Sequence, residues 1–225
     1  MRLVGGFSKL LGYSVAVAAA MLVTTAEAKV NKAIVRAVRG TADVSTDKGS
    51  TWKPVRVGSQ LSPSTTIRTG VGSVVDLFLG DNGPVVRVTA DTEMGIDRLD
   101  SEGTGADKVI ETQLDLKNGR ILGNVKKLAD ASKYEVKTPV GVAGIRGTEY
   151  DISANGTVHV ISGVVQVVYV DMTDPANPKT TTVTVTEGQT ARPPTAPGQQ
   201  PTIVSTTALP PDQRPTLSDV RAIEI

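Results

Sequence analysis

Residues 138–152 carry the most information about this chain, and they read Thr138-Pro139-Val140-Gly141-Val142-Ala143-Gly144-Ile145-Arg146-Gly147-Thr148-Glu149-Tyr150-Asp151-Ile152. Pro139 fixes one backbone angle and lacks an amide donor, so it predicts an interruption or the end of a strand. Gly141, Gly144 and Gly147 recur at every third position, where each suits a turn, a bulge or a close approach of two backbones. Extended chain resumes at Glu149. The segment therefore predicts strands joined by a glycine-rich irregular region.

The rest of the body predicts short strands separated by turns. Segments rich in β-branched residues, many alternating with polar ones, are typical of half-buried strands; they are residues 74–79, 85–88, 109–116, 134–136, 157–160, 164–170 and 181–186. Hairpin-type turns are predicted at Asp47-Lys48-Gly49, Asp81-Asn82-Gly83 and Ala154-Asn155-Gly156. Residues 123–131 have a helical spacing, with strand and turn as the alternative. The predicted fold is all-β, a compact β-roll or twisted β-sandwich of many short strands that leaves few open edges.

Further short motifs flank residues 138–152 in a fixed order. They are Trp52, Gly58-Ser59-Gln60-Leu61, Ile67-Arg68-Thr69-Gly70, residues 73–79, Leu114-Asp115-Leu116-Lys117-Asn118-Gly119, Ser162-Gly163-Val164-Val165-Gln166-Val167 and Glu187-Gly188-Gln189. With the Thr-Pro and Arg-Gly-Thr block, this ordered set resembles the FecR domain family from about residue 35 to residue 189. The resemblance implies structural roles for the motif residues, namely Trp52, Gly58, Leu61, Arg68, Thr69, Gly70, Gly119, Thr138, Pro139, Gly141, Arg146, Gly147, Thr148, Gly163 and Gly188.

The resemblance also implies a function of a general kind, an extracytoplasmic binding or signalling module rather than an enzyme. The best-known members of the family join a cytoplasmic anti-sigma segment and one spanning helix to a periplasmic FecR domain. This sequence shows neither an anti-sigma segment before its export signal nor a later apolar run long enough to span a bilayer. We therefore expect a secreted FecR-domain protein that lacks both of those parts.

The N-terminus predicts a secretory signal peptide. Arg2 and Lys9 supply a basic start, residues 10–23 form the apolar region, and Ala26-Glu27-Ala28 is a typical cleavage pattern. An uncleaved anchor is the alternative, but a spanning helix needs roughly 20 apolar residues and this run is shorter. We expect cleavage after Ala28, a mature chain from Lys29 and a periplasmic or secreted location.

Composition changes after Gln189, where seven prolines occur in a stretch rich in Thr, Gln and Ala. Proline at this density favours extended, solvated chain over sheet ladders. Residues 217–225 regain an apolar and polar alternation, which indicates a docking strand, a short helix or a frayed terminus, with fraying preferred. The predicted organisation is a signal peptide at 1–28, a FecR-like all-β domain at 29–189 and a Pro-rich linker and tail at 190–225.

Composition excludes several classes of function. The chain has 24 basic and 23 acidic residues, and removing Arg2, Lys9 and Glu27 with the signal leaves 22 of each. No basic excess is present to neutralise phosphates, so we expect no nucleic-acid partner. Cysteine is absent, which excludes disulfides, thiolate metal sites and a cysteine nucleophile. Aromatic residues make up 3%, too few for stacking platforms.

No arrangement of side chains predicts catalysis, a metal site or a cofactor. His159 is the only histidine, and the strand pattern predicts an outward position for it rather than a role as base or ligand. Glu149 and Asp151 share one face of a strand and could serve hydrolysis or bind Ca²⁺. Arg120 and Arg146 could instead pair with them. The acidic residues of one loop region do not match a calcium loop and indicate a solvated face; they are Asp91, Glu93, Asp97, Asp100 and Glu102.

Arg146 has a sharper prediction attached to it. It lies between Ile145 and Gly147, where backbones are expected to approach closely. Its planar fork of donors could satisfy several carbonyl groups at such a turn. We predict a structural clamp rather than a substrate-binding residue.

Three functions remain open at this point. The preferred one is an exported, non-enzymatic protein-interaction module that contacts another envelope protein or a cell-wall component, for which exposed strand edges would serve as docking surfaces. The second is an ancillary sensor of a transport or sigma-factor system, working with a separate membrane subunit. The third and least favoured is an envelope hydrolase using Glu149 and Asp151.

Overall fold

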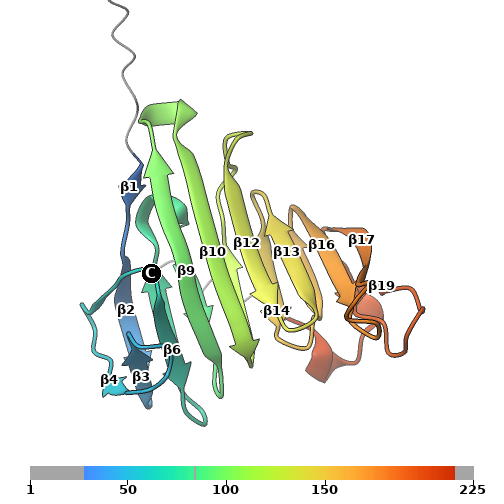
Figure 1. Cartoon of the computed structure of the whole chain (residues 1–225), viewed down its shortest axis with the longest axis horizontal. Coiled ribbons are helices and arrows are strands. Elements are labelled where there is room, and N and C mark those ends of the chain that lie inside the picture. The colour runs from blue at the N-terminus through green and yellow to red at the C-terminus, as the bar shows by residue number, and fades with distance from the viewer. Residues whose placement is uncertain (1–27, 84, 216–225) are drawn as a thin grey trace, which may run out of the picture.

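The structure, a computed structural model, describes residues 28–83 and 85–215. These residues contain no α-helix and form two large stacked sheets, which confirms the predicted all-β class (Figure 1). Four short 3₁₀ turns occur among them: η1 (Gly80–Asn82), η2 (Gly105–Asp107), η3 (Thr206–Ala208) and η4 (Pro211–Gln213). The predicted signal peptide falls almost wholly outside the described residues.

Each sheet runs the length of the molecule. The first contains, in spatial order, β17 (Lys179–Thr186), β16 (Val164–Asp171), β13 (Gly141–Ile145), β12 (Lys133–Thr138), β10 (Val109–Asn118), β9 (Glu93–Glu102), β6 (Thr65–Thr69), β3 (Ala42–Ser45) and β4 (Lys53–Pro54), with β1 (Lys29–Val30) paired to β9. The second contains β19 (Thr202–Ser205), β18 (Gln189–Arg192), β15 (Val158–Ser162), β14 (Glu149–Ser153), β11 (Arg120–Asn124), β8 (Val85–Val88), β7 (Val74–Phe78), β2 (Ala33–Arg39) and β5 (Gln60–Leu61).

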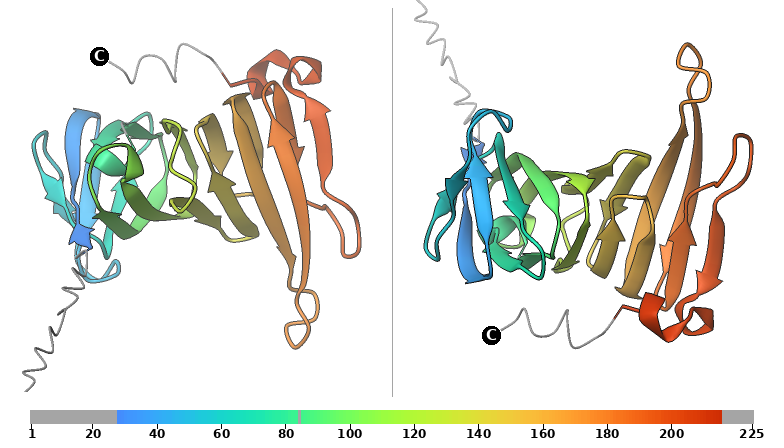
Figure 2. Two further views of the ribbon diagram at one scale, coloured as in Figure 1. Left: turned by 90° about the horizontal axis from the view of Figure 1, so that it is seen from above. Right: turned by 90° about the horizontal axis from the view of Figure 1, so that it is seen from below.

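The chain advances along both sheets in the same direction. From β9 onward it alternates between them, placing β9–β10, β12–β13 and β16–β17 in the first sheet and β11, β14–β15 and β18–β19 in the second (Figure 2). Because β11 crosses to the second sheet, β10 and β12 return side by side and pair in parallel; every other pairing is antiparallel. From β6 onward the order of strands in each sheet therefore follows the order of the sequence, whereas β4 and β5 lie at the end opposite to β17 and β19, and β1 pairs with β9.

A single large core fills the space between the sheets. In β10 the side chains of Ile110, Thr112, Leu114 and Leu116 are buried and alternate with more exposed ones, the period of two that a one-sided strand requires. The two largest buried side chains, Tyr134 and Tyr150, meet at the centre with hydroxyl oxygens 3.1 Å apart. Burial raises the pKa of both phenols, so both remain neutral.

Residues after Gln189 differ from the prediction. We expected solvated chain there, but Gln189–Arg192 pairs with β15 as β18, and Thr202–Ser205 pairs with β18 as β19. The prolines do not interrupt these ladders because they lie in the loop between the two strands and in the segment that follows. Residues 217–225 lie outside the described residues, so the alternatives for that terminus stay as predictions.

Two other local expectations have clear outcomes. Residues 123–131 form the end of β11 and irregular chain, so the strand-and-turn alternative holds over the helical one. The turn at Ala154-Asn155-Gly156 joins β14 to β15, with Gly156 at a φ of 87°. Within the part of the chain that the structure describes, no helix has the length and hydropathy to cross a bilayer.

Candidate functional site

Residues 138–152 carry the chain from the first sheet to the second. Thr138 ends β12, β13 occupies Gly141–Ile145, and β14 begins at Glu149 in the other sheet. At Gly141 a Cβ atom would lie 2.2 Å from the carbonyl oxygen of Val168, so the backbones of β13 and β16 approach too closely for any side chain. The predicted close approach is present at this glycine, whereas a Cβ at Gly144 would meet only an ordinary contact.

The turn after β13 is fixed to the turn before β16. The Thr148 hydroxyl donates to the Val164 carbonyl at 2.8 Å and accepts from the Val164 amide at 3.2 Å. Gly163 has a φ of 92°, and a Cβ there would lie 2.3 Å from the Gly147 carbonyl oxygen. Gly147, Thr148 and Gly163 therefore lock the two crossings together.

The N-terminal motif residues are also placed within the framework. The Arg68 guanidinium lies 4.1 Å from the centroid of the Trp52 ring and pairs with Asp43 at 2.9 Å. The Thr69 hydroxyl accepts from the Thr92 amide at 3.0 Å, and Gly119 packs against Thr92. The remaining motif positions make backbone or core contacts: Gly58 with Val35, Leu61 in the core, Gly70 with Thr41, Thr138 with Gly141 and Gly188 with Val160.

The predicted clamp at Arg146 is wrong. Its side chain is 55% exposed, and its guanidinium pairs with the carboxylate of Asp130 rather than with backbone carbonyls. The close approach of backbones occurs at Gly141, against Val168 of β16, and at Gly147, against Lys127.

Glu149 and Asp151 lie on one face of β14, as the register with β11 shows, but they do not form a catalytic pair. Asp151 is fully buried and receives two hydrogen bonds from Arg120, at 2.7 and 2.5 Å. A carboxylate held by a bidentate guanidinium has its charge matched and its lone pairs occupied. The prediction that Arg120 could pair with these carboxylates holds for Asp151, whereas Arg146 does not pair with either.

His159 lies on the outer face of the second sheet but is largely buried. Only 8% of the residue is exposed, and its Nδ1 lies 2.7 Å from the Thr190 hydroxyl of β18. The predicted outward position holds, because Val158 and Val160 on either side of it belong to the core, but Thr190 of the neighbouring strand β18, itself bonded to Thr206, lies against the ring and shields it from solvent. Burial lowers the pKa of His159, with the Asp151 carboxylate opposing and the Arg120 and Arg192 guanidinium groups adding to the effect.

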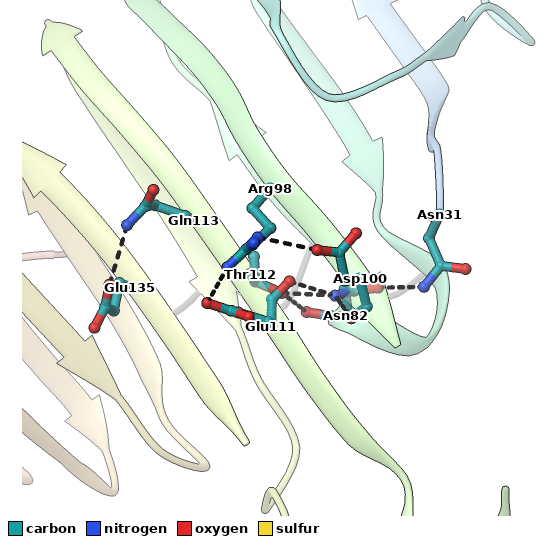
Figure 3. Close-up of polar contacts among 8 residues, drawn as sticks. All are labelled: Asn31, Asn82, Arg98, Asp100, Glu111, Thr112, Gln113 and Glu135. Carbon is teal, nitrogen blue, oxygen red and sulfur yellow. Dashed lines mark hydrogen bonds and ion pairs between the residues drawn. The ribbon is translucent and has the colours of Figure 1, made fainter. Parts of the chain in front are cut away.

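The prediction of an acidic loop region is wrong, because Glu93–Glu102 forms strand β9, but its acidic residues do not gather into a site. Glu93 pairs with Lys117 and Asp97 with Lys137, each at 3.2 Å, and Asp100 pairs with Arg98 at 3.0 Å. Figure 3 shows Arg98 between Asp100 and Glu111 on adjacent strands. In residues 28–83 and 85–215 no group of three or more acidic or histidine side chains is arranged to hold a metal ion.

A buried polar contact ties the two sheets together, and sequence reasoning missed it. The Asn82 side chain donates to the Asp100 carbonyl at 2.8 Å and to the Thr112 hydroxyl at 2.9 Å, and it accepts from Asn31 at 2.6 Å (Figure 3). Asn82 follows β7 of the second sheet, whereas its partners belong to or flank strands of the first. The sequence predicted a hairpin turn at Asp81-Asn82-Gly83 and carried no signal of the inward side chain.

The open surface of the molecule lies at its C-terminal end. β17 is the last strand of the first sheet, and no described strand pairs with its outer edge (Figure 1). It is eight residues long and pairs with β16 without a bulge. At the opposite end the edge strands β4 and β5 have two residues each. Long, regular edges present unpaired amides and carbonyls, whereas very short ones do not.

The side chains around that edge are uncharged. Thr180, Thr182, Thr184 and Thr186 are exposed, while Val185 on the other face is buried in the core. Apart from Lys179 at its start, β17 has no charged residue, and β16 has none before Asp171. Natural edge strands are commonly blunted by lysine, proline or a bulge, and the body of β17 has none of these. We call the outer edge of β17 and its four exposed threonines the β17 edge.

A groove of about 930 Å³ adjoins the start of β17. The β16–β17 hairpin, which projects beyond the sandwich in Figure 2, forms one side, and the loop between β18 and β19 forms the other. Its apolar lining includes Val140, Tyr169, Pro193 and the 56% exposed Met172. A chain lying along the β17 edge would continue into this groove.

Comparison with protein families identifies the body of the molecule. Residues 65–166 match the family described as FecR protein. The chain contains a FecR domain. Proteins of this family are envelope-associated signalling components and are generally non-catalytic. No curated protein matches the chain by sequence.

The FecR match covers only part of the double sheet. It begins at β6 and ends within β16, so β17, β18 and β19 lie beyond the matched residues. The crossing at residues 138–152 and the Thr148 contacts fall inside the FecR domain, whereas the β17 edge and its groove fall mostly outside it. The β17 edge and its groove are thus built largely by the chain that follows the domain match.

Proposed function

We propose that this protein is an exported, non-enzymatic interaction module of the cell envelope that binds an extended segment of a partner protein along the β17 edge. The observation that carries the proposal is the eight-residue edge of β17, which no strand of residues 28–83 and 85–215 pairs and which has no bulge or proline. An extended peptide can add to such an edge through main-chain hydrogen bonds. The export signal predicted at residues 1–28 supports a periplasmic or secreted location.

The groove beside β17 supports the same proposal. Strand addition gives affinity through the backbone and needs side-chain pockets for specificity. Tyr169, Val140 and the exposed Met172 offer an apolar pocket next to Lys179, where β17 begins. The partner that fits is an uncharged, β-branched segment that ends in an apolar side chain.

In-cell photo-crosslinking tests this function. A crosslinking residue placed at Thr182 or Thr184 should give one dominant adduct with an envelope protein, and the same residue at the exposed Thr46 or Thr104 should not. Thr182→Lys combined with Thr184→Lys should abolish the adduct, because lysines along an edge oppose strand addition. Thr46→Lys combined with Thr104→Lys makes the same chemical change elsewhere and should leave it intact. Equal adducts at all four positions, or none at β17, would contradict the proposal.

A second function is favoured by the FecR match itself, an ancillary sensor that acts with a separate membrane subunit of a transport or sigma-factor system. Deleting the gene and replacing it with the double lysine variant of β17 separates the two. A sensor requires that the variant change the expression of the genes under that system's control. If the variant loses the crosslinked adduct but the transcript profile is unchanged, the sensor function is contradicted and the interaction module remains.

The hydrolase receives no support from the geometry. Asp151 is enclosed and held by Arg120, and Glu149 is left without a second carboxylate that is open to substrate. We therefore propose no catalytic role for either residue.

A further inference from the structure

A second cavity lies on the outer face of the second sheet, away from the β17 edge. Its volume is about 530 Å³. The floor comprises residues of β11, β14, β15 and β18, and the roof is the chain around η4, which lies against the end of this sheet (Figure 2). We call it the arginine pocket, because Arg120, Arg192 and Arg214 all line it.

Two of these arginines keep an unbalanced charge. Arg192 Nη2 donates to the amide oxygen of Gln213 at 2.7 Å. Arg214 donates from Nε to the Leu209 carbonyl at 2.8 Å and from Nη2 to the Thr207 carbonyl at 2.7 Å. All three acceptors are neutral, and no described carboxylate forms an ion pair with either guanidinium. A guanidinium carries five N–H donors, so these contacts use one on Arg192 and two on Arg214.

The remaining charges of the pocket do not cancel the pair. Arg120 is balanced by the buried Asp151, to which it donates two hydrogen bonds. Asp212 also lines the pocket and offsets one of the two unbalanced cations. The charged side chains that line the cavity therefore have a net charge of one positive unit once the Arg120–Asp151 pair is counted as neutral. Arg192 lies on the floor of the cavity, and Arg214 lies on its roof.

His159 adds a further group to the same cavity. Its Nδ1 is occupied by Thr190, and Thr190 in turn lies 2.9 Å from the Thr206 hydroxyl. The other ring nitrogen, Nε2, has no hydrogen bond to a described residue. Because no buried side-chain nitrogen or oxygen among the described residues lacks a hydrogen-bond partner, Nε2 is not buried, and we infer that it faces the cavity that His159 lines. Ser153 and Thr157 lie on the same face of the sheet and line the pocket beside it.

We propose that the arginine pocket is a binding site for an oxyanion group, a phosphate or a carboxylate, held between the guanidinium groups of Arg192 and Arg214. Guanidinium donors match the geometry of such groups and form strong charge-assisted hydrogen bonds with them. In the cell envelope, the same chemistry is presented by free phosphate and by phospholipid headgroups. The arginine pocket shares part of its lining, including Pro193 and Thr195, with the groove beside β17, but Arg192 and Arg214 line only the arginine pocket, so variants of these two arginines test it separately from the proposed function.

The single histidine provides a direct test in the intact mature protein. NMR signals of the His159 ring should shift saturably when inorganic phosphate or acetate is added at constant ionic strength, with a Kd near the millimolar range. Arg192→Gln combined with Arg214→Gln should weaken that affinity at least tenfold. Arg39→Gln combined with Arg56→Gln removes two exposed arginines elsewhere and should leave the affinity unchanged.

Two outcomes would overturn the proposal. One is that the His159 signals of the wild-type protein do not shift when phosphate or acetate is added. A shift that is linear in anion concentration and equal in the wild type and both double variants counts the same way, because non-specific ionic effects would produce it. The other is unchanged affinity in the pocket variant, provided its melting temperature shows that it is folded. If the pocket variant does not fold, Arg214→Lys is the alternative; it keeps the charge but loses the fork, and should still weaken phosphate binding severalfold.

A sedimentation experiment then separates the two sources of the anion. Vesicles containing anionic phospholipid should carry the wild-type protein down, and the pocket variant less so, if the ligand is a headgroup. Binding of free phosphate without vesicle binding assigns the pocket to a soluble anion. Vesicle binding that is equal in both proteins, together with an absence of phosphate binding, would contradict a site at Arg192 and Arg214.

Discussion

At the residue scale, some glycines are required because a side chain would collide with a neighbour, whereas others only adopt a positive φ. Gly163 combines a φ of 92° with a neighbour that leaves no space, because a Cβ there would meet the Gly147 carbonyl oxygen at 2.3 Å. Gly188 has a similar φ of 73° but faces open space. The two positions therefore separate backbone strain from steric exclusion.

We predict that Gly163→Ala lowers the free energy of unfolding by about 2 to 4 kcal/mol, since both strain and the collision contribute. Gly188→Ala should cost about 1 kcal/mol, from the positive φ alone. Urea denaturation of the two variants measures the difference. Equal losses would show that the contact between residues 147 and 163 can relax.

His159 gives a second prediction at this scale, a loss of stability on mild acidification. Its pKa in the folded protein lies below the ordinary value of 6.5, so between the two values the unfolded chain binds more protons. The stabilisation is complete above about pH 6.5 and declines as the pH falls toward the folded pKa. The charged groups near the ring are Asp151, Arg120 and Arg192.

Melting temperatures measured between about pH 7.5 and pH 5.5 test this expectation, because other side-chain types titrate mostly outside that window. His159→Gln can keep a hydrogen bond to Thr190, and its melting temperature should depend less on pH in this range than that of the wild type. A variant as sensitive to pH as the wild type would assign the effect to another group.

At the element scale, the alternation of apolar and polar residues was sufficient to predict the all-β class and several strands, but it missed β9, whose charged residues indicated a loop. Residues 109–116 and 164–170, for instance, fall within β10 and β16. The same pattern could not predict the burial of His159 or of Asn82, since their surroundings come from residues far away in sequence. Thr190 of β18 lies against His159, and β9 and β10 enclose Asn82. The pattern also missed the partner of Arg146, because Asp130 lies in irregular chain sixteen residues earlier.

Asn82 offers a test of how the elements are joined. We predict that Asn82→Ala lowers the free energy of unfolding by about 3 kcal/mol, because it leaves several buried groups of β9 and β10 without a partner. Asn118→Ala, which removes one exposed contact to the Asp91 carbonyl, should cost less than about 1 kcal/mol. Similar costs for both would show that the Asn82 contacts are replaced by water.

At the scale of the whole molecule, the boundary between body and tail differs most from what composition suggests. Proline counts indicated a linker after residue 189, yet β18 and β19 continue the second sheet. Thr190 and Ala191 are fully buried, and the segment around η3 and η4 contains the buried Leu209. Composition averages over a window and cannot distinguish prolines within strands from prolines between them.

A truncated chain tests whether this end is integral. We predict that a mature protein ending at residue 188 loses cooperative unfolding or melts well below the intact protein, because it uncovers Val158, Val160 and His159. A chain ending at residue 215 keeps every described element and should melt like the full one. If the fragment ending at residue 188 has the same melting temperature as the intact protein, the domain boundary after residue 189 that composition predicted is correct.

The central claim is that a partner adds a strand to the β17 edge, and hydrogen exchange of the complex with the crosslinked partner tests it most directly. The account predicts that peptides covering residues 179–186 gain protection on binding, because newly paired amides exchange slowly, while those covering residues 202–205 do not change. Protection confined to any other surface, with β17 exchanging as in the free protein, would contradict the claim.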